Sequence, residues 1–120
     1  MSQLVDVVTA SPPFVVDQAY ATEFARARFA SMPHIDRLMP LFANTGIKTR
    51  RVCRPPEWYG ESHGLEEKNA AYIESATELC ATAGRELLTR HGLSPQDIDR
   101  VYYINTTGLA TPSIDARLIN

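Results

Sequence analysis

The sequence is poor in the residues that build metal centres, disulfide frameworks and nucleic-acid surfaces. It has two cysteines and three histidines in 120 residues, and none of the histidines is spaced from cysteines or acids as in a metal site. Cys53 and Cys80 show no close pairing, so we expect reduced thiols and a cytoplasmic protein. Twelve basic and fourteen acidic residues leave a net charge of −2, which argues against nucleic acid as the main partner.

Long apolar runs and glycine-rich phosphate loops are also missing. No stretch approaches the roughly 20 apolar residues that a membrane-spanning helix needs. The first residues, MSQLVDVVTA, include Asp6 and lack the basic start of a signal peptide. No G-x-G-x-x-G or phosphate-loop pattern occurs. With 44% apolar residues, the chain has enough apolar side chains to form the core of one small α/β domain. We expect no membrane partner.

The first half of the chain predicts short strands and broken helices. Leu4–Thr9 is β-branched and is typical of a first strand. Asp17 is suited to cap a helix over Gln18–Met32. A second helix over His34–Ala43 should be kinked or split by Pro40, because proline removes an amide donor.

The second half predicts an edge strand, a long helix and a buried strand. Ile47–Arg54 alternates apolar and basic residues, as an edge strand does. Apolar residues over Leu65–His91 recur with the 3.6-residue period of an amphipathic helix. Gly84 falls on the buried side of that helix, so we expect a neighbouring element to approach it closely. Val101–Thr106 is rich in β-formers and predicts a buried strand.

The last twenty residues contain the most informative local pattern. After the predicted strand, Thr106-Thr107-Gly108 forms a polar turn, and Pro112-Ser113 opens a new helix. A strand that runs through a hydroxyl-rich turn into a helix N-terminus is where open α/β sheets bind ligands. Thr106, Thr107 and Thr111 could equally be turn formers and a helix cap, and spacing alone does not decide between these interpretations.

No nucleophile or phosphate site stands out from the residues alone. Cys80 lies on the apolar stripe of the long helix and is interpreted as a small core residue. Cys53 has basic neighbours that would lower its pKa if close, but no histidine partner, which favours a structural role. The basic cluster of Lys48, Arg50, Arg51 and Arg54 is either a solvated edge or the mouth of a phosphate-binding site.

Two motifs together resemble a known family. Asn44-Thr45-Gly46-Ile47 followed by Arg50 resembles the T-G-I-x-x-R element of condensing enzymes with a thiolase fold. Thr106–Leu118, TTGLATPSIDARL, resembles the matching segment of bacterial type III polyketide synthases, relatives of chalcone synthase. The resemblance covers the chain from about His34 onward.

The resemblance implies a fold and a reaction. The fold is α/β, with residues 1–120 as the N-terminal portion of the first thiolase-like domain of an αβαβα layered enzyme. Such enzymes are cytoplasmic homodimers that load an acyl-CoA starter on a cysteine and extend it with malonyl-CoA, without a cofactor or a metal. Their Cys-His-Asn triad would lie beyond Asn120, so these 120 residues alone should be inactive.

The resemblance also implies roles for individual residues. Thr106 and Thr107 match hydroxyl positions of the substrate cavity. Thr111 matches the position that, in the plant enzymes, sends a methionine across the dimer interface. A small threonine there leaves room for a longer acyl starter. Arg37 matches a CoA-binding position. Pro40 and Asn44 depart from the two others, which shifts the expected CoA contacts towards Lys48 and Arg50.

The function expected from this resemblance is synthesis of alkylpyrone- or alkylresorcinol-type polyketides. The alternatives are a fragment of ketoacyl-carrier-protein synthase III, which shares the T-G-I-x-x-R element, and a non-catalytic dimerisation remnant. Asp115-Ala116-Arg117-Leu118 favours the polyketide synthase over the ketoacyl-carrier-protein synthase III. The residues present here do not specify the starter, the number of extensions or the ring closure.

Overall fold

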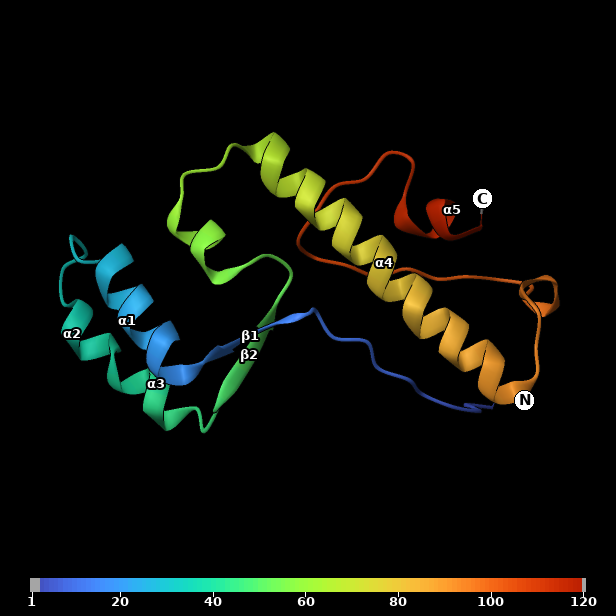
Figure 1. Cartoon of the computed structure of the whole chain (residues 1–120), viewed down its shortest axis with the longest axis horizontal. Helices are drawn as coiled ribbons and strands as arrows, with labels where there is room; N and C mark the ends of the chain where they lie inside the picture. The colour runs from blue at the N-terminus through green and yellow to red at the C-terminus, as the bar shows by residue number, and fades with distance from the viewer. Residues whose placement is uncertain (1–2, 120) are drawn as a thin grey trace. The chain divides into compact units, whose positions relative to one another are not determined.

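The computed structural model describes residues 3–119, which form two compact units. The two-strand unit is Pro12–Ser62. The long-helix unit combines residues 3–11 with residues 63–119. Each unit is described separately below, and Figure 1 labels the helices and strands of both.

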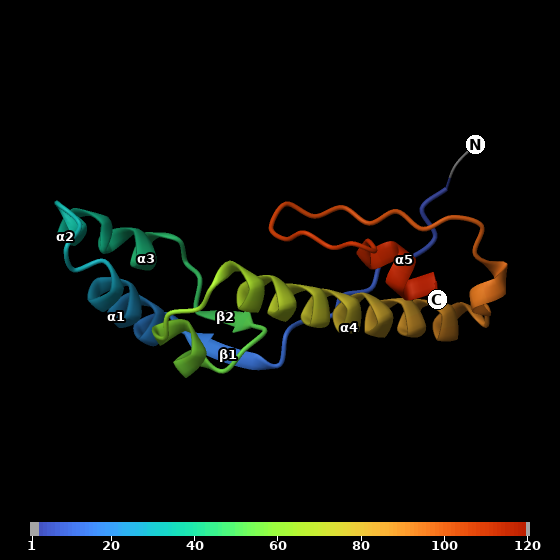
Figure 2. The ribbon, with the colours of Figure 1, turned by 90° about the horizontal axis from the view of Figure 1, so that it is seen from above.

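The two-strand unit is built on an antiparallel pair, β1 (Phe14–Asp17) and β2 (Thr49–Val52). Phe14 lies opposite Val52 and Asp17 opposite Thr49, and Figure 2 shows the two strands side by side. The expected edge strand over Ile47–Arg54 is therefore confirmed in its central residues.

Three helices follow β1 in the same unit. The first, α1 (Gln18–Arg28), begins as predicted at Asp17, whose Oδ1 accepts a hydrogen bond from the Tyr20 amide at 2.7 Å. It ends before the predicted Met32. Pro40 splits the second predicted helix into α2 (Ile35–Leu38) and α3 (Pro40–Asn44), as expected of a residue that cannot donate to the preceding turn.

The connection out of this unit uses a glycine and a short 3₁₀ turn. Gly46 follows α3 with φ = 68°, a left-handed conformation that costs glycine little. After β2 the chain makes the 3₁₀ helix η1 (Pro56–Gly60), which contains the only tryptophan. The Tyr59 hydroxyl in η1 lies 3.4 Å from the Cys53 thiol. The pKa of Tyr59 is raised, mainly by burial and to a smaller extent by this contact.

The long-helix unit is organised by α4 (Leu65–His91), which has the predicted bounds. The Glu67 carboxylate accepts from the Gly64 amide at 3.0 Å at its start, and Gly92 ends it with φ = 61°. Acids in the first turn and Arg90 with His91 in the last turn match the helix dipole. A 3₁₀ turn, η2 (Pro95–Asp97), follows.

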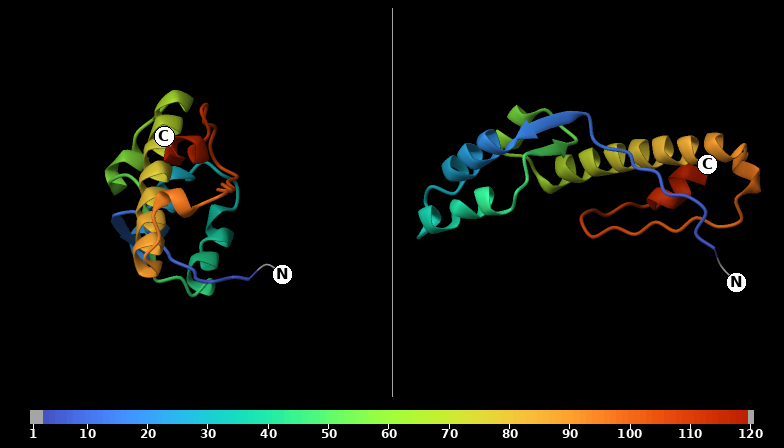
Figure 3. Two further views of the ribbon diagram at one scale, coloured as in Figure 1. Left: turned by 90° about the vertical axis from the view of Figure 1, so that its right-hand side faces the viewer. Right: turned by 90° about the horizontal axis from the view of Figure 1, so that it is seen from below.

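The last helix, α5 (Ile114–Ile119), packs against α4. Ile114 is its anchor and is only 1% exposed. Figures 2 and 3 show α5 lying beside the middle of α4, with the preceding segment running back along the long helix. The helix start expected at Pro112-Ser113 is therefore confirmed.

The predicted strand over Leu4–Thr9 is wrong. The segment is extended but pairs with no other described strand, and Leu4 and Val5 are 81% and 73% exposed. Asp6 ties it to the end of α4, with Oδ2 at 3.0 Å from His91 Nε2 and 3.7 Å from Arg90 Nη1. The hydrogen bond with His91 is the main reason that the pKa of Asp6 is lowered.

The buried strand predicted over Val101–Thr106 is also wrong. Tyr102 and Ile104 are 79% and 90% exposed, and no backbone hydrogen bond joins residues 101–105 to another segment within residues 3–119. The physical reason is that a strand forms only when a neighbour completes its backbone hydrogen bonds. Among the residues described, no such neighbour lies beside this segment.

Gly84 does not mark a close approach within the described chain. No atom lies within 4 Å of the position that a Cβ would take there. The glycine that another residue approaches is Gly108, where a Cβ would collide with the Tyr72 ring. The polar turn of the sequence prediction is therefore a closely packed turn.

Candidate functional site

The three threonines singled out by the sequence lie on one loop of the long-helix unit. We call residues 105–111 the threonine loop. Thr106, Thr107 and Thr111 are all exposed in the structure. Their hydroxyls make no hydrogen bond within residues 3–119, so all three are available to a ligand.

The first half of the threonine loop is held by its own Asn105. Asn105 Oδ1 accepts from the Thr107 and Gly108 amides, each at 3.2 Å. This is the side-chain turn that asparagine favours. It satisfies two backbone donors locally, so the turn needs no strand partner at this point.

The second half of the loop is held by α4. Asn69 Nδ2 donates to the Leu109 carbonyl at 2.7 Å, and Asn69 Oδ1 accepts from the Leu109 amide at 3.0 Å. Beside it, the Tyr72 ring packs on Gly108, and the Tyr72 hydroxyl lies 3.0 Å from that of Tyr103. Burial and this hydroxyl contact raise the pKa of Tyr103 to about 12.

The end of the loop, just before α5, is held by Arg117. Arg117 Nε donates to the Pro112 carbonyl at 3.0 Å, and Arg117 Nη2 lies 3.5 Å from the Thr111 carbonyl oxygen. The Thr111–Pro112 peptide bond is cis. The backbone of the loop is thus tied at both ends while its hydroxyl side chains face outward.

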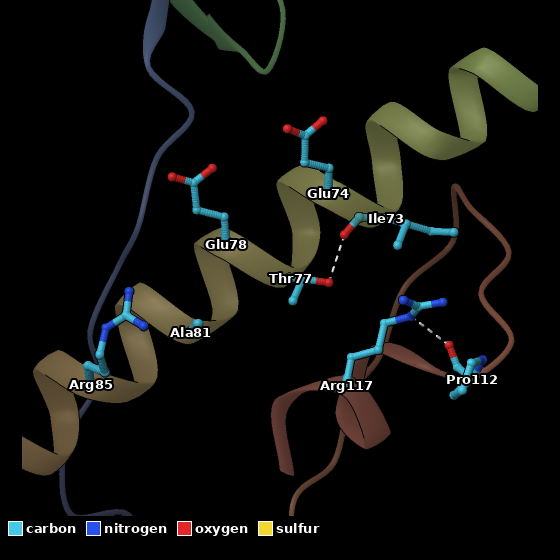
Figure 4. A pocket seen from close by; sticks show the side chains of 8 residues that line it. All are labelled: Ile73, Glu74, Thr77, Glu78, Ala81, Arg85, Pro112 and Arg117. Atoms are coloured by element: carbon cyan, nitrogen blue, oxygen red, sulfur yellow. Dashed lines mark hydrogen bonds between the residues drawn. The ribbon is translucent and has the colours of Figure 1, made fainter. Parts of the chain in front are cut away.

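An open groove of about 660 Å³ lies between α4 and the start of α5. Figure 4 shows Ile73, Thr77 and Ala81 on the α4 side, with Pro112 and Arg117 opposite. Its polar groups do not converge on a point, since the Thr77 hydroxyl donates to the Ile73 carbonyl of its own helix. The groove therefore has the form of a packing surface between helices.

The three basic residues expected to bind CoA lie in the two-strand unit. Arg37 on α2 and Lys48 before β2 are exposed. Arg50 in β2 is half-buried: its guanidinium donates to Gln18 Oε1 and lies 5.7 Å from the centre of the Phe42 ring. Arg37 and Lys48 can meet a phosphate freely, whereas Arg50 already has an internal partner.

Gln18 joins three elements around Arg50. Its side-chain Nε2 donates to the Phe42 carbonyl and lies 3.4 Å from Thr45 Oγ1. Its backbone N–H donates to the Lys48 carbonyl at 2.9 Å. Sequence reasoning missed this residue, because a glutamine in the first turn of a helix gives no signal of its own.

Asn69 lies on the apolar stripe that the sequence predicts for the long helix. A polar amide among apolar neighbours needs hydrogen-bond partners, and that requirement was the available signal. The partner itself, Leu109, lies forty positions away, which no local pattern identifies.

Neither cysteine forms a catalytic pair. Cys53 contacts the Tyr59 hydroxyl, and burial raises the pKa of Cys80, which disfavours the reactive thiolate. No histidine hydrogen-bonds either thiol in the part of the chain that the structure describes. Residues 3–119 also hold no group of three potential metal ligands and no helix long and apolar enough to cross a membrane.

The chain was compared with known proteins in sequence and in structure. It is 39% identical, over its whole length, to a Bacillus subtilis (strain 168) protein named for chalcone synthase. It is 32% identical to 1,3,6,8-tetrahydroxynaphthalene synthase of Streptomyces coelicolor A3(2) over 91% of its length. The crystal structure of that synthase, described as a bacterial type III polyketide synthase, superposes on 93% of this chain with a TM-score of 0.84.

The chain is related to the type III polyketide synthases. No protein-family model matches it, so this assignment rests on the relatives and on the superposition. The chain spans about a third of the length of these relatives. The expected fold class, the α/β layered fold of thiolase-like enzymes, is confirmed by the match to the type III polyketide synthase structure.

Proposed function

We propose that this chain is the N-terminal part of a type III polyketide synthase that condenses an acyl-CoA starter with malonyl-CoA. The observation that carries the proposal is agreement in both sequence and fold over nearly the whole chain: 39% identity to one relative and a TM-score of 0.84 to another. The proposed products are of the alkylpyrone or alkylresorcinol type. The proposed enzyme acts as a cytoplasmic homodimer and needs no cofactor.

The threonines would form one wall of the substrate cavity. Thr106 and Thr107 would face the growing chain, and Thr111 would face the partner subunit. Their exposed and uncommitted hydroxyls support this role, because a cavity wall must offer groups that no internal contact has already used. The short side chain of Thr111 is the feature that favours a long acyl starter over a small one.

The basic residues Arg37, Lys48 and Arg50 would bind the phosphates of CoA. The exposed Arg37 and Lys48 suit this directly. Arg50 uses one N–H on Gln18 and has four more donors in its guanidinium group. In the proposed enzyme the Cys-His-Asn triad lies outside these 120 residues, so the chain alone would be inactive.

The test is a product analysis of the protein that contains this chain. Purified enzyme would receive labelled malonyl-CoA with a fatty acyl-CoA, and the extract would be analysed by mass spectrometry. Alkylpyrones or alkylresorcinols that carry the fatty chain are expected. Transfer that requires an acyl carrier protein would instead indicate a ketoacyl-carrier-protein synthase III, and no condensation with either donor would indicate a non-catalytic remnant.

A second candidate product is favoured by a specific observation. The 32%-identical relative, whose crystal structure superposes on this chain, is named for 1,3,6,8-tetrahydroxynaphthalene. A tetrahydroxynaphthalene in the same extract, with no fatty chain in any product, would support this candidate over the alkyl products while leaving the polyketide synthase assignment intact.

A further inference from the structure

We propose that Asn69 is a positioning residue of the substrate cavity, which holds the threonine loop and thereby sets which acyl starter the synthase prefers. This inference rests on the proposed function, since it assigns a role within the same site. Asn69 lies on α4 and is not one of the residues expected to bind CoA or to line the cavity.

Asn69 uses both the donor and the acceptor of its side-chain amide on one residue. It donates to the Leu109 carbonyl at 2.7 Å and accepts from the Leu109 amide at 3.0 Å. A paired donor and acceptor reproduce the hydrogen bonds of a β-ladder, so the contact fixes both the position and the orientation of this peptide. The Leu109 side chain itself is 76% exposed, so the backbone is what the contact holds.

A neighbouring residue of α4, Tyr72, contacts the loop residue that precedes Leu109. Tyr72 lies three positions after Asn69 on α4, and such pairs share one helix face. Its ring packs on Gly108, and its hydroxyl contacts Tyr103, which lies before the loop. One face of α4 therefore contacts two consecutive loop residues, Gly108 and Leu109.

Without the contact between Asn69 and Leu109, the remaining hydrogen bonds of the loop would hold only its two ends. Asn105 shapes the turn around Thr107, and Arg117 holds the Thr111 and Pro112 carbonyls. Neither contact ties the middle of the loop to α4. Loss of the Asn69 amide would leave only the packing of Tyr72 on Gly108 between the centre of the loop and α4, so Leu109 could move, and with it the hydroxyls on either side. A displacement of about 1 Å at such a wall can change rates about a hundredfold.

The test measures starter preference, which does not depend on the fraction of folded enzyme. The protein that contains this chain would receive malonyl-CoA with equal amounts of a long and a short acyl-CoA. In Asn69→Leu, which matches the size of asparagine without its donor and acceptor, we expect the ratio of long-chain to short-chain product to change about tenfold. Asn69→Gln keeps both groups and should retain more of the parent ratio.

Two controls complete the design. Gln96→Leu makes the same amide-to-leucine change at an exposed position on η2 and should leave the ratio unchanged. Hydrogen exchange of the Leu109 amide gives a readout that needs no activity, and it should accelerate at least tenfold in Asn69→Leu and not in Gln96→Leu.

The outcomes separate the inference from the function on which it rests. An unchanged product ratio in Asn69→Leu would overturn the inference, and so would unchanged exchange at Leu109. Absence of polyketides from the unmutated protein would overturn the proposed function; the role in starter choice falls with it, whereas the exchange measurement still decides whether Asn69 holds the loop. A ratio that changes equally in Gln96→Leu would also count against a specific role of Asn69.

Discussion

The two units differ in how their extended segments satisfy the backbone. In the two-strand unit, β1 and β2 pair with each other over four residues, so each strand has a partner within the same unit. In the long-helix unit, residues 3–11 and 101–105 are also extended but pair with no described strand. A β-forming composition therefore specifies an extended conformation, whereas a strand also requires a neighbour.

Hydrogen exchange along the chain tests this difference between the two units most directly. In the 120-residue protein, the paired amides of β1 and β2 should exchange at least about a hundredfold more slowly than the amides of Val101–Asn105. Strong protection of residues 101–105 would mean that a partner is already present, in another copy for example. In a longer protein that supplies a neighbouring strand, the same amides should become protected.

Gly108→Val should produce the largest mutational effect in the long-helix unit. A Cβ at this position collides with the Tyr72 ring, and overpacking of this kind costs typically about 1–3 kcal/mol of unfolding free energy. Denaturant unfolding followed by tyrosine fluorescence would measure it. Gly84→Ala is the matched control, because no atom lies within 4 Å of its Cβ position, and it should stabilise α4 by up to about 1 kcal/mol. Equal effects at the two glycines would contradict the packing described for Gly108.

Asp17→Ala probes the two-strand unit at the junction of β1 and α1. The carboxylate accepts from the Tyr20 amide at 2.7 Å, and loss of such a cap costs about 1 kcal/mol. Chemical denaturation should show this loss, and Asp17→Asn, which keeps a capping oxygen, should show much less. A loss as large in Asp17→Asn as in Asp17→Ala would indicate that the carboxylate charge, and not the cap, is what matters.

The last expected effect is confined to high pH and arises at the Tyr72–Tyr103 contact. The pKa of Tyr103 rises from 10.0 to about 12 because its phenol is partly buried. Since the unfolded chain then ionises first, the long-helix unit should lose stability as the pH rises from about 10 to about 12. Absorbance titration should show a tyrosine with a pKa of about 12, and Tyr103→Phe should abolish that step, whereas the raised pKa of Tyr59 should remain. Persistence of that step in Tyr103→Phe would assign it to another tyrosine.

Sequence reasoning succeeded where the cause of a structure is local. Asp17 caps α1, Pro40 separates α2 from α3, and the 3.6-residue period marks α4. Each of these depends on residues within about four positions of one another, so the information lies in a short window. The motif Thr106–Leu118 also indicated the family, because the order of residues in a motif is a property of sequence alone.

Only the tertiary structure decided what depends on distant partners. It left Val101–Thr106 exposed because no described strand completes its hydrogen bonds, and it showed the Gly108 turn to be packed on Tyr72. It also joined Asn69 to Leu109 and Gln18 to Arg50 across long stretches of chain. The sequence by itself determined the helices, the bounds of α4 and the kinship of the chain. The structure determined which polar groups hold the threonine loop, since such pairings depend on how the chain folds back on itself.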